Sequence, residues 1–570
     1  MKKLLSIILA VAMLVLVFAG CGSAGVSSTN AVSDSAQGVN DAAPSVDAVV
    51  PEENEAPASD VSSEPAPQAE AVSTVEEGTT SPDHPATWLS DETVTLTMMW
   101  PWVGFYNTVG IEDMSQSIYY EELEKRLNVK LDLTLVGEEY QTAFMLMCAG
   151  GDLTDIIASA DSNYSTGADA CIEDDIILDL SDKIEEYAPD YFALLNNNPE
   201  LKKQCTTDSG YVPSFRYVND EAQTLRNLPV IRKDLLDQLG MDIPVTLEEA
   251  HDVLTAFKNE FQMDTPLLVD AVGTSTYIQT AFGPYGLYLD NGKAVYDFRT
   301  ENFKNYISYM RQLVEEGIVN SDFVSMDVGA DYRDFVTGGR SAIVNGMLYS
   351  DFNQYEENGI DLVAVPPVLE DASKKSEMGD IPVWAPSSNA TSISTQCEEW
   401  EIAMAYFNYN YTEEGSFLAN WGVEGKTFEY DDSGKPQYTE YVTNNPNIPQ
   451  VLVLMYDCCW AVGYLLDTHN LDGTLSRDEL EAREIYQSAF SGHSQTYPTD
   501  YITLTADESA EISTIQTDLD TFVEENIAHF IAGDTPLREF DSFVDSIYEK
   551  FDMELLESVY GDAYDRYMNR

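Results

Sequence analysis

The most constraining feature of the sequence is a hydrophobic period that switches repeatedly between residues 93 and 158. Residues 93–100 and 129–136 alternate apolar and polar side chains, as strands with one buried face do. A short amphipathic helix is predicted after the first strand and another near 140–149 after the second, and a third strand is predicted at 155–158. The order strand, helix, strand, helix, strand predicts a parallel sheet with right-handed crossovers.

A parallel sheet of this kind suggests where a ligand would bind. In open α/β sheets, ligands lie beyond the carboxyl ends of the strands. The residues at or just after those predicted ends are Trp100, Trp102, Asp161 and Tyr164. We therefore predict that these four side chains contribute to a ligand site.

Helical signals dominate the later sequence. Thr246 with Glu249, and Thr505 with Glu508, have the spacing of a capping box at the start of an amphipathic helix. The helix after Thr505 is predicted to stop at Gly533, and another is predicted to begin at Thr535–Pro536. Strands followed by many helices favour a mixed α/β fold.

The N-terminus has the pattern of an export signal. Lys2 and Lys3 precede an apolar run over 4–19, which is short for a permanent membrane helix. The run ends at Phe18-Ala19-Gly20-Cys21, which is similar to a bacterial lipobox. This predicts a lipoprotein signal peptide over 1–20 and a lipidated Cys21 at the mature N-terminus. Ordinary secretion, with Cys21 incidental, is the alternative.

A long segment after Cys21 cannot build a core. From Gly22 to Thr87 there is no Leu, Ile, Met, Phe, Tyr or Trp, and small, acidic and proline residues dominate. Such a segment buries too little apolar surface to offset its ordering entropy. We expect residues 21–90 to be the lipidated cysteine followed by a disordered acidic linker, with folded sequence from about residue 91.

The charge of the chain excludes several classes of partner. Its 570 residues include 29 Lys and Arg against 99 Asp and Glu, a formal net charge of −70. Nucleic-acid binding requires clustered cations, so nucleic acid is not expected as a partner. A neutral or cationic ligand fits this field better than an anionic one. The six cysteines after Cys21 are too sparse for a disulfide framework.

Signatures of catalysis and of metal binding are weak. The five histidines are far apart in sequence, and neither an H-E-x-x-H nor a G-x-S-x-G motif occurs. Residues 468–479 fit a calcium loop except at the first position, where Thr468 replaces the expected aspartate, so a polar turn is favoured. The sequence therefore predicts no catalytic residue, no metal and no cofactor.

Four passages carry a family resemblance from about residue 91 to the end. They are 228–240 with 243–249, 331–346, 420–436, and 530–534 with 563–567. In this order they resemble the extracellular solute-binding lipoproteins of bacterial ABC importers, family 1 type, in a Gram-positive branch associated with oligosaccharide uptake. Some members carry a calcium loop after the helix that matches 247–257. The corresponding stretch here, 258–266, lacks the expected Asp and Asn ladder.

The resemblance implies a two-lobed, periplasmic-binding-protein-like α/β fold with a hinge and an interlobe cleft, preceded by the signal peptide and linker. From the family order we expect the first lobe to comprise 91–217 and 330–385, and the second lobe 218–329 and 386–570. The chain crosses between lobes near Arg216 and Tyr217, and again near Tyr349 and Asp351. These four are predicted to contact ligand, with a structural role at the hinge as the alternative.

The chemistry of sugars independently fits this assignment. Sugars present flat C–H faces and a rim of hydroxyls, which suit aromatic rings combined with polar side chains. Besides Trp100 and Trp102, we expect Trp384 and Trp421 to supply such rings, because both lie in loop-like sequence. Packing in the core is the alternative for each of these tryptophans.

We therefore predict a monomeric, non-enzymatic binding protein on the outer face of the cell membrane, held there through its lipid anchor alone. It would capture a solute, most simply a neutral oligosaccharide, and deliver it to the permease subunits of an ABC importer. Three alternatives remain: a binding protein for peptide or another solute, a polysaccharide-cleaving enzyme, and a structural surface protein.

Overall fold

Two separate β-sheets organise the folded part of the chain. The computed structural model describes residues 87–570, which fall in one compact unit. Within that range it leaves out 103, 115, 138, 223–228, 327–334, 345–354, 356–358, 367, 372, 374–383, 386–389, 449, 460–461, 476–479, 486–494, 496 and 500. The predicted signal peptide, Cys21, nearly all of the linker, Tyr349 and Asp351 therefore lie outside the described residues.

The first sheet has five strands in the order β2-β1-β3-β11-β4. Strand β1 (Val94–Pro101) pairs in parallel with β2 (Val129–Val136) along its full length and with β3 (Ile156–Ala158). The helices α3 (Ile118–Leu127) and α4 (Tyr140–Gly150) connect these strands. The predicted strand and helix order over 93–158 is confirmed.

Two further strands extend this sheet from distant parts of the sequence. Strand β11 (Ala390–Ile393) is antiparallel to both β3 and β4 (Phe215–Arg216). The remaining elements of this first lobe, which we define as the described residues of 87–219 and 384–466, are α2 (Phe105–Thr108), α5 (Ala160–Asn163), α6 (Gly167–Glu173), α7 (Ile184–Tyr187), α8 (Pro189–Asn197), α9 (Pro199–Cys205), β5 (Val218–Asn219), α16 (Trp400–Tyr409), α17 (Glu413–Trp421), β12 (Phe428–Tyr430), β13 (Pro436–Tyr438), α18 (Glu440–Thr443), α19 (Gln450–Asp457) and β14 (Leu465–Leu466).

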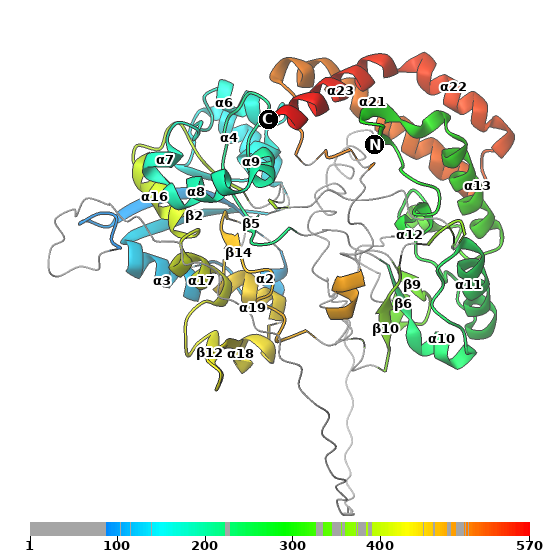
Figure 1. Cartoon of the computed structure of the whole chain (residues 1–570), viewed down its shortest axis with the longest axis horizontal. Coiled ribbons are helices and arrows are strands. Elements are labelled where there is room, and N and C mark those ends of the chain that lie inside the picture. The colour runs from blue at the N-terminus through cyan, green and yellow to red at the C-terminus, as the bar shows by residue number, and fades with distance from the viewer. Residues whose placement is uncertain are drawn as a thin grey trace, which may run out of the picture. The chain divides into compact units, whose positions relative to one another are not determined.

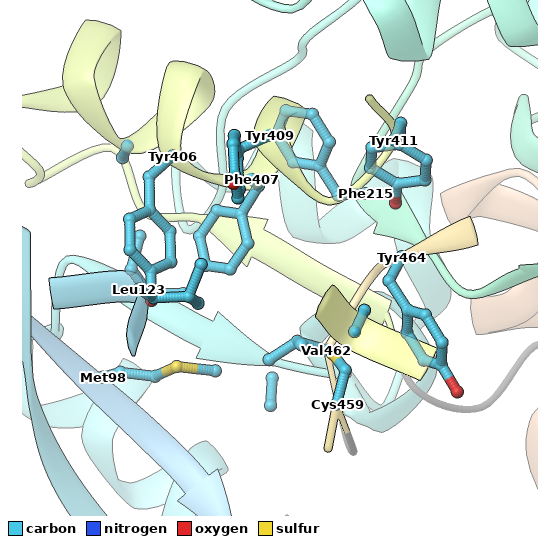
Figure 2. Packing of buried hydrophobic residues seen from close by; sticks show 14 of the residues in the cluster. Met98, Leu123, Phe215, Tyr406, Phe407, Tyr409, Tyr411, Cys459, Val462 and Tyr464 are labelled. Atoms are coloured by element: carbon cyan, nitrogen blue, oxygen red, sulfur yellow. The ribbon is translucent and has the colours of Figure 1, made fainter. Parts of the chain in front are cut away.

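The core of the first lobe joins both of its sequence segments. Met98 of β1, Leu123 of α3 and Phe215 of β4 pack in one hydrophobic cluster with Phe407 of α16 and Val462 (Figure 2). Aromatic rings make much of this contact, and Phe215 lies 5.8 Å from Phe407 between ring centroids. The cluster therefore fixes residues 400–464 onto the sheet that begins the folded chain.

The second sheet is smaller and has the order β10-β6-β9. Its central strand is antiparallel to both neighbours. The elements of this second lobe, defined as the described residues of 229–371 and 497–570, are β6 (Val230–Arg232), α10 (Lys233–Leu239), α11 (Leu247–Phe261), α12 (Thr276–Gln279), β7 (Leu287–Asp290), β8 (Lys293–Tyr296), η1 (Asp297–Arg299), α13 (Glu301–Glu315), η2 (Phe323–Ser325), β9 (Ile343–Val344), β10 (Leu362–Ala364), α21 (Ala506–Ala532), η4 (Leu537–Glu539), α22 (Phe540–Lys550) and α23 (Met553–Asn569). In Figure 1 the first lobe appears in blue, cyan and yellow, and the second in green and red.

Local capping signals set the starts of the long helices. Both predicted capping boxes are present, at Thr246 for α11 and at Thr505 for α21. Helix α21 ends at Gly533, which adopts a left-handed conformation with φ 98°. After Pro536 the chain first makes a 3₁₀ turn, η4, and α22 begins only at Phe540. No helix in the described part of the chain is both long and apolar enough to cross a membrane.

The expected lobe boundaries differ from the hydrogen bonding. Strands β9 and β10, expected in the first lobe, pair with β6 of the second. Strand β11 and the segment 400–464, expected in the second lobe, belong to the sheet and core of the first. These pairings join residues more than 100 positions apart, and no local pattern in the sequence specifies them.

A buried ion cluster joins the two lobes. The side chain of Asp208, in the loop after α9, is fully buried. It accepts hydrogen bonds from Arg566, at 2.6 Å, and from Arg570, both in the C-terminal part of the second lobe. Arg566 also donates to Glu508 of α21 at 2.6 Å, and the Asp208 backbone N–H donates to the Thr503 hydroxyl oxygen at 2.9 Å. One carboxylate thus ties α23 to the first lobe.

The cysteines of the described chain are unpaired thiols. Cys171, Cys205, Cys397, Cys458 and Cys459 are buried, and Cys148 is half-buried. Burial raises the pKa of Cys205 to about 11 and that of Cys397 to about 12. Adjacent Cys458 and Cys459 pack in the interior of the first lobe, where burial also raises both pKa values. All of these thiols are therefore protonated at neutral pH.

Asp297, which follows β8, should make stability depend on pH. Its carboxylate is buried, and Oδ1 accepts the Gly286 backbone N–H at 3.0 Å, while Oδ2 has no partner in the part of the chain that the structure describes. Burial raises the pKa of Asp297 from 3.8 to about 8. The native state therefore binds more protons than the unfolded state between about pH 4 and pH 8, and this group lowers the free energy of unfolding as pH rises through that window.

Asp297→Asn should remove this dependence. The variant and the wild type should have similar stability near pH 4, and by pH 8 the variant should be more stable by at least about 1.4 kcal/mol, the value of one pKa unit. Urea unfolding at pH 4.5, 6 and 8 measures the difference. Parallel pH profiles for the two proteins would contradict the assignment.

Candidate functional site

One edge of the first sheet gathers most of the predicted site residues. Because β1 and β3 are parallel and β11 is antiparallel to β3 and β4, the carboxyl ends of β1, β3 and β4 share this edge with the start of β11. The Ser159 N–H, just past β3, donates to the Ala390 carbonyl at 2.7 Å. We call this the carboxyl edge. Asp161, Arg216, Tyr217 and Trp384 all lie within six residues of these strand ends.

Asp161 and Arg216 form a buried ion pair at the carboxyl edge. Arg216 Nη2 lies 2.8 Å from Asp161 Oδ2, and the Ser214 hydroxyl donates to the same oxygen at 2.8 Å. Burial disfavours the charge of Arg216, but Asp161 favours it and the pKa of Arg216 stays above its usual value. Asp161 Oδ1 is buried and has no hydrogen-bond partner among the described residues. The pair is electrically neutral as a whole, and one acceptor atom is left over.

Trp384 and Tyr217 belong to the same edge, and both are half-buried. The Trp384 carbonyl accepts the Asn219 N–H at 2.8 Å, and the Trp384 N–H donates to Gln204 Oε1 at 2.8 Å. The Tyr217 ring packs edge-to-face on Tyr464 with centroids 5.0 Å apart. The carboxyl edge therefore holds two partly exposed aromatic rings as well as a polar pair, a combination suited to a ring-shaped ligand that bears hydroxyl groups.

The two tryptophans at the end of β1 differ in burial. Trp100 is fully buried and packs edge-to-face on Tyr120 at 5.6 Å. Trp102 is half-buried, packs on Tyr106 at 4.8 Å and donates from Nε1 to Asn107 at 3.2 Å. Alternation along a strand puts both on one face, so sequence cannot distinguish them. Because Trp102 is more exposed than Trp100, it is the better candidate for a ligand contact.

Two other predicted residues lie in different surroundings. Tyr164 donates its hydroxyl to Asp174 at 2.7 Å, and burial together with this carboxylate raises the pKa of Tyr164. Trp421, expected in a loop, is the last residue of α17, which stops at Gly422 with φ 75°. Its indole is only 8% exposed and packs on Tyr438 at 4.7 Å. A ligand role for either residue stays a prediction.

Gln204 is a residue of the candidate site that sequence reasoning missed. It is buried, and its side-chain oxygen accepts both the Trp384 and the Ala385 backbone N–H, at 2.8 and 3.0 Å. It therefore fixes the position of the tryptophan from a helix 180 residues earlier in the chain. A single glutamine near the end of α9 gives no periodic or motif signal that could have revealed this.

Comparison with known structures supports the two-lobed fold. The structure matches an alginate-binding protein, AlgQ2, with a TM-score of 0.68 and 18% identity over 84% of this chain and all of that one. The chain has the two-lobed fold of bacterial solute-binding proteins. This confirms the predicted fold class, and the solute-binding fold accounts for both sheets described above. No family model matches the chain.

Relatives found by sequence include a substrate-binding protein of an ABC transporter and a lipoprotein. The chain is 20% identical to the fructooligosaccharide ABC transporter substrate-binding protein FusA of Streptococcus pneumoniae serotype 4, over 80% of this chain and 88% of FusA. It is 24% identical to the lipoprotein LipO of Bacillus subtilis, over 59% of this chain and 68% of LipO. A structure of FusA in complex with kestose matches with a TM-score of 0.66 and 19% identity. The predicted homology to substrate-binding proteins of ABC importers is confirmed.

Proposed function

We propose that this protein captures a neutral oligosaccharide and delivers it to the permease of an ABC importer, without making or breaking a bond. The observation that carries the proposal is the carboxyl edge, which holds the neutral Asp161–Arg216 pair and the half-buried Trp384 and Tyr217. The names of FusA and of the alginate-binding protein support a glycan as the ligand class. Alginate is anionic, so the choice of a neutral glycan depends on the fructooligosaccharide in the name of FusA and on the net charge of −70.

The mechanism follows from the two-lobed fold. A ligand that contacts both lobes stabilises the closed arrangement, because the two sets of contacts exist together only there. Trp102, Trp384 and Tyr217 would stack on sugar rings, and Asp161 and Arg216 would bond hydroxyls. Cys21 would carry the lipid that holds a monomer on the outer face of the membrane, and the permease would recognise the closed form.

Trp384→Ala should abolish ligand-induced stabilisation. Binding to the native state alone adds about 2.7 kcal/mol when ligand is at 100 Kd, which raises Tm by several degrees. We expect at least one of kestose, maltotriose, mannotriose and xylotriose to raise the Tm of the full chain, and the variant to show no rise at the same concentration. Differential scanning fluorimetry measures both.

Trp400→Ala is the matched control. Trp400 is another half-buried tryptophan of the first lobe, but it packs on Tyr187 of α7 at 5.0 Å. The Trp400→Ala variant should therefore show the same ligand-induced rise in Tm as the wild type. A rise with peptides and none with glycans would favour the peptide alternative, and release of shorter sugars from a glycan would favour the enzyme.

A further inference from the structure

A concave surface lies on the first lobe, away from the carboxyl edge. It is a cavity of about 620 Å³, lined by Arg126, Glu413, Glu414, Phe417, Leu418 and Tyr430. This volume falls in the range of about 300–1,000 Å³ typical of ligand pockets. The lining comes from α3, α17 and β12, three elements that the sequence alone does not bring together.

The topology separates this cavity from the site already described. Arg126 lies near the end of α3, just before β2, whose first residue Val129 pairs with Val94, the first residue of β1. Arg126 therefore lies at the amino edge of the sheet. Strand β1 is eight residues long, so the two edges are about 25 Å apart. No side chain of the carboxyl edge lines the cavity.

The aromatic part of the cavity is held in place from behind. Tyr430 is 50% exposed, and its ring stands edge-on to Phe428 with centroids 5.4 Å apart. Phe428 in turn contacts Phe417, another lining residue, at 5.2 Å. The tyrosine is thus a large, partly exposed ring on a supported strand, which can bind an apolar face without much loss of side-chain entropy.

The charged part of the cavity disfavours an anionic ligand. Arg126 already contacts Glu414 at 2.7 Å, Glu122 at 3.0 Å and the Tyr409 hydroxyl at 3.1 Å. Its positive charge is therefore compensated. Within the described chain the exposed Glu413 side chain makes no ion pair, so it offers two free acceptor oxygens. The whole chain carries a net charge of −70.

We propose that this cavity is a second carbohydrate-binding site, which holds a neutral glycan chain with a sugar face against Tyr430 and sugar hydroxyls on Glu413 and Glu414. The cavity combines the exposed ring of Tyr430, two carboxylates that can accept hydrogen bonds from hydroxyls, and an arginine whose positive charge is already compensated. The proposal rests on the glycan ligand class of the proposed function. Two sites on one lobe raise the retention of a long glycan, because the second contact is made at high effective concentration.

Affinity electrophoresis of the full chain through gels that contain inulin, pullulan, arabinoxylan or galactomannan tests the proposal. In the Trp384→Ala background the carboxyl-edge site is disabled, and we expect at least one polysaccharide still to retard the protein. Adding Tyr430→Ala should weaken the remaining affinity about tenfold or more, as loss of an aromatic anchor does. Glu413→Gln should weaken it too.

Glu429→Gln is the matched control, because Glu429 is an exposed neighbour of Tyr430 that does not line the cavity. It should leave retardation unchanged. If Trp384→Ala alone removes all retardation, or if Tyr430→Ala changes nothing in that background, the second site is refuted and the proposed function stands. If no glycan retards or stabilises any variant, both fail. Binding of an oligolysine peptide that depends on Tyr430, without glycan binding, would also overturn the proposal.

Discussion

Arg216→Ala is expected to lower the free energy of unfolding by about 3–5 kcal/mol, the usual consequence of removing one partner of a buried ion pair. The loss of stability arises because the Asp161 carboxylate would remain buried without its positively charged partner. The Asp161 side chain is only 1% exposed, and without the guanidinium the Ser214 hydroxyl would be its one remaining hydrogen-bond partner among the described residues. Urea unfolding followed by circular dichroism measures the loss.

An exposed ion pair provides the comparison for this variant. Arg340 contacts Asp264 at 2.8 Å, but both side chains are about half exposed. Arg340→Ala should therefore cost less than about 1 kcal/mol. Equal losses for the two variants would show that burial of the Asp161–Arg216 pair does not matter. Arg216→Lys, which keeps the charge, should recover part of the lost stability. It should still weaken the proposed contact between Arg216 and a ligand hydroxyl, because that contact needs the planar guanidinium.

Asp208→Ala is expected to have an effect of similar size, about 3–5 kcal/mol, for a different reason. Here one carboxylate serves two guanidiniums, and its side chain is fully buried. Arg566 would keep Glu508, whereas the Arg570 side chain, only 9% exposed, would lose its carboxylate partner. The loss of stability in Asp208→Ala should therefore be greatest where α23 contacts the first lobe.

Hydrogen–deuterium exchange can locate that cost. Amides of residues 560–569 should exchange faster in Asp208→Ala, while those of β1 and β2 should change little. Asp541→Ala is the control, because Asp541 pairs with Lys304 at the surface and is 75% exposed. Unchanged protection of α23 in the Asp208 variant would contradict the role given to this cluster.

Local signals explain why the sequence predicted most of the elements correctly. The capping boxes at Thr246 and Thr505 determine helix starts through hydrogen bonds within four residues, and the alternation over 129–136 matches β2 residue for residue. Each of these patterns depends on neighbours in the chain. They also predicted the strand ends, and with them the position of Asp161 just after β3; its role as a site residue stays a prediction.

Features that depend on distant contacts could not be predicted in this way. The pairing of β11 with β3 joins residues more than 200 positions apart, which is why the lobe boundaries were misplaced. Trp100 and Trp102 have the same position in the strand pattern, yet only one is fully buried. Nothing in the sequence around Tyr430 indicated a cavity, because the cavity that it lines is completed by Arg126, some 300 residues away.

The protonated thiols of the interior have a practical consequence for labelling. Maleimides and iodoacetamides react with thiolates, and the described native cysteines present very few of them at neutral pH. A fluorophore pair could therefore be attached at cysteines introduced on the two lobes while the native thiols are retained, with half-buried Cys148 the one position to check. Energy transfer between such dyes would report lobe movement directly, one molecule at a time.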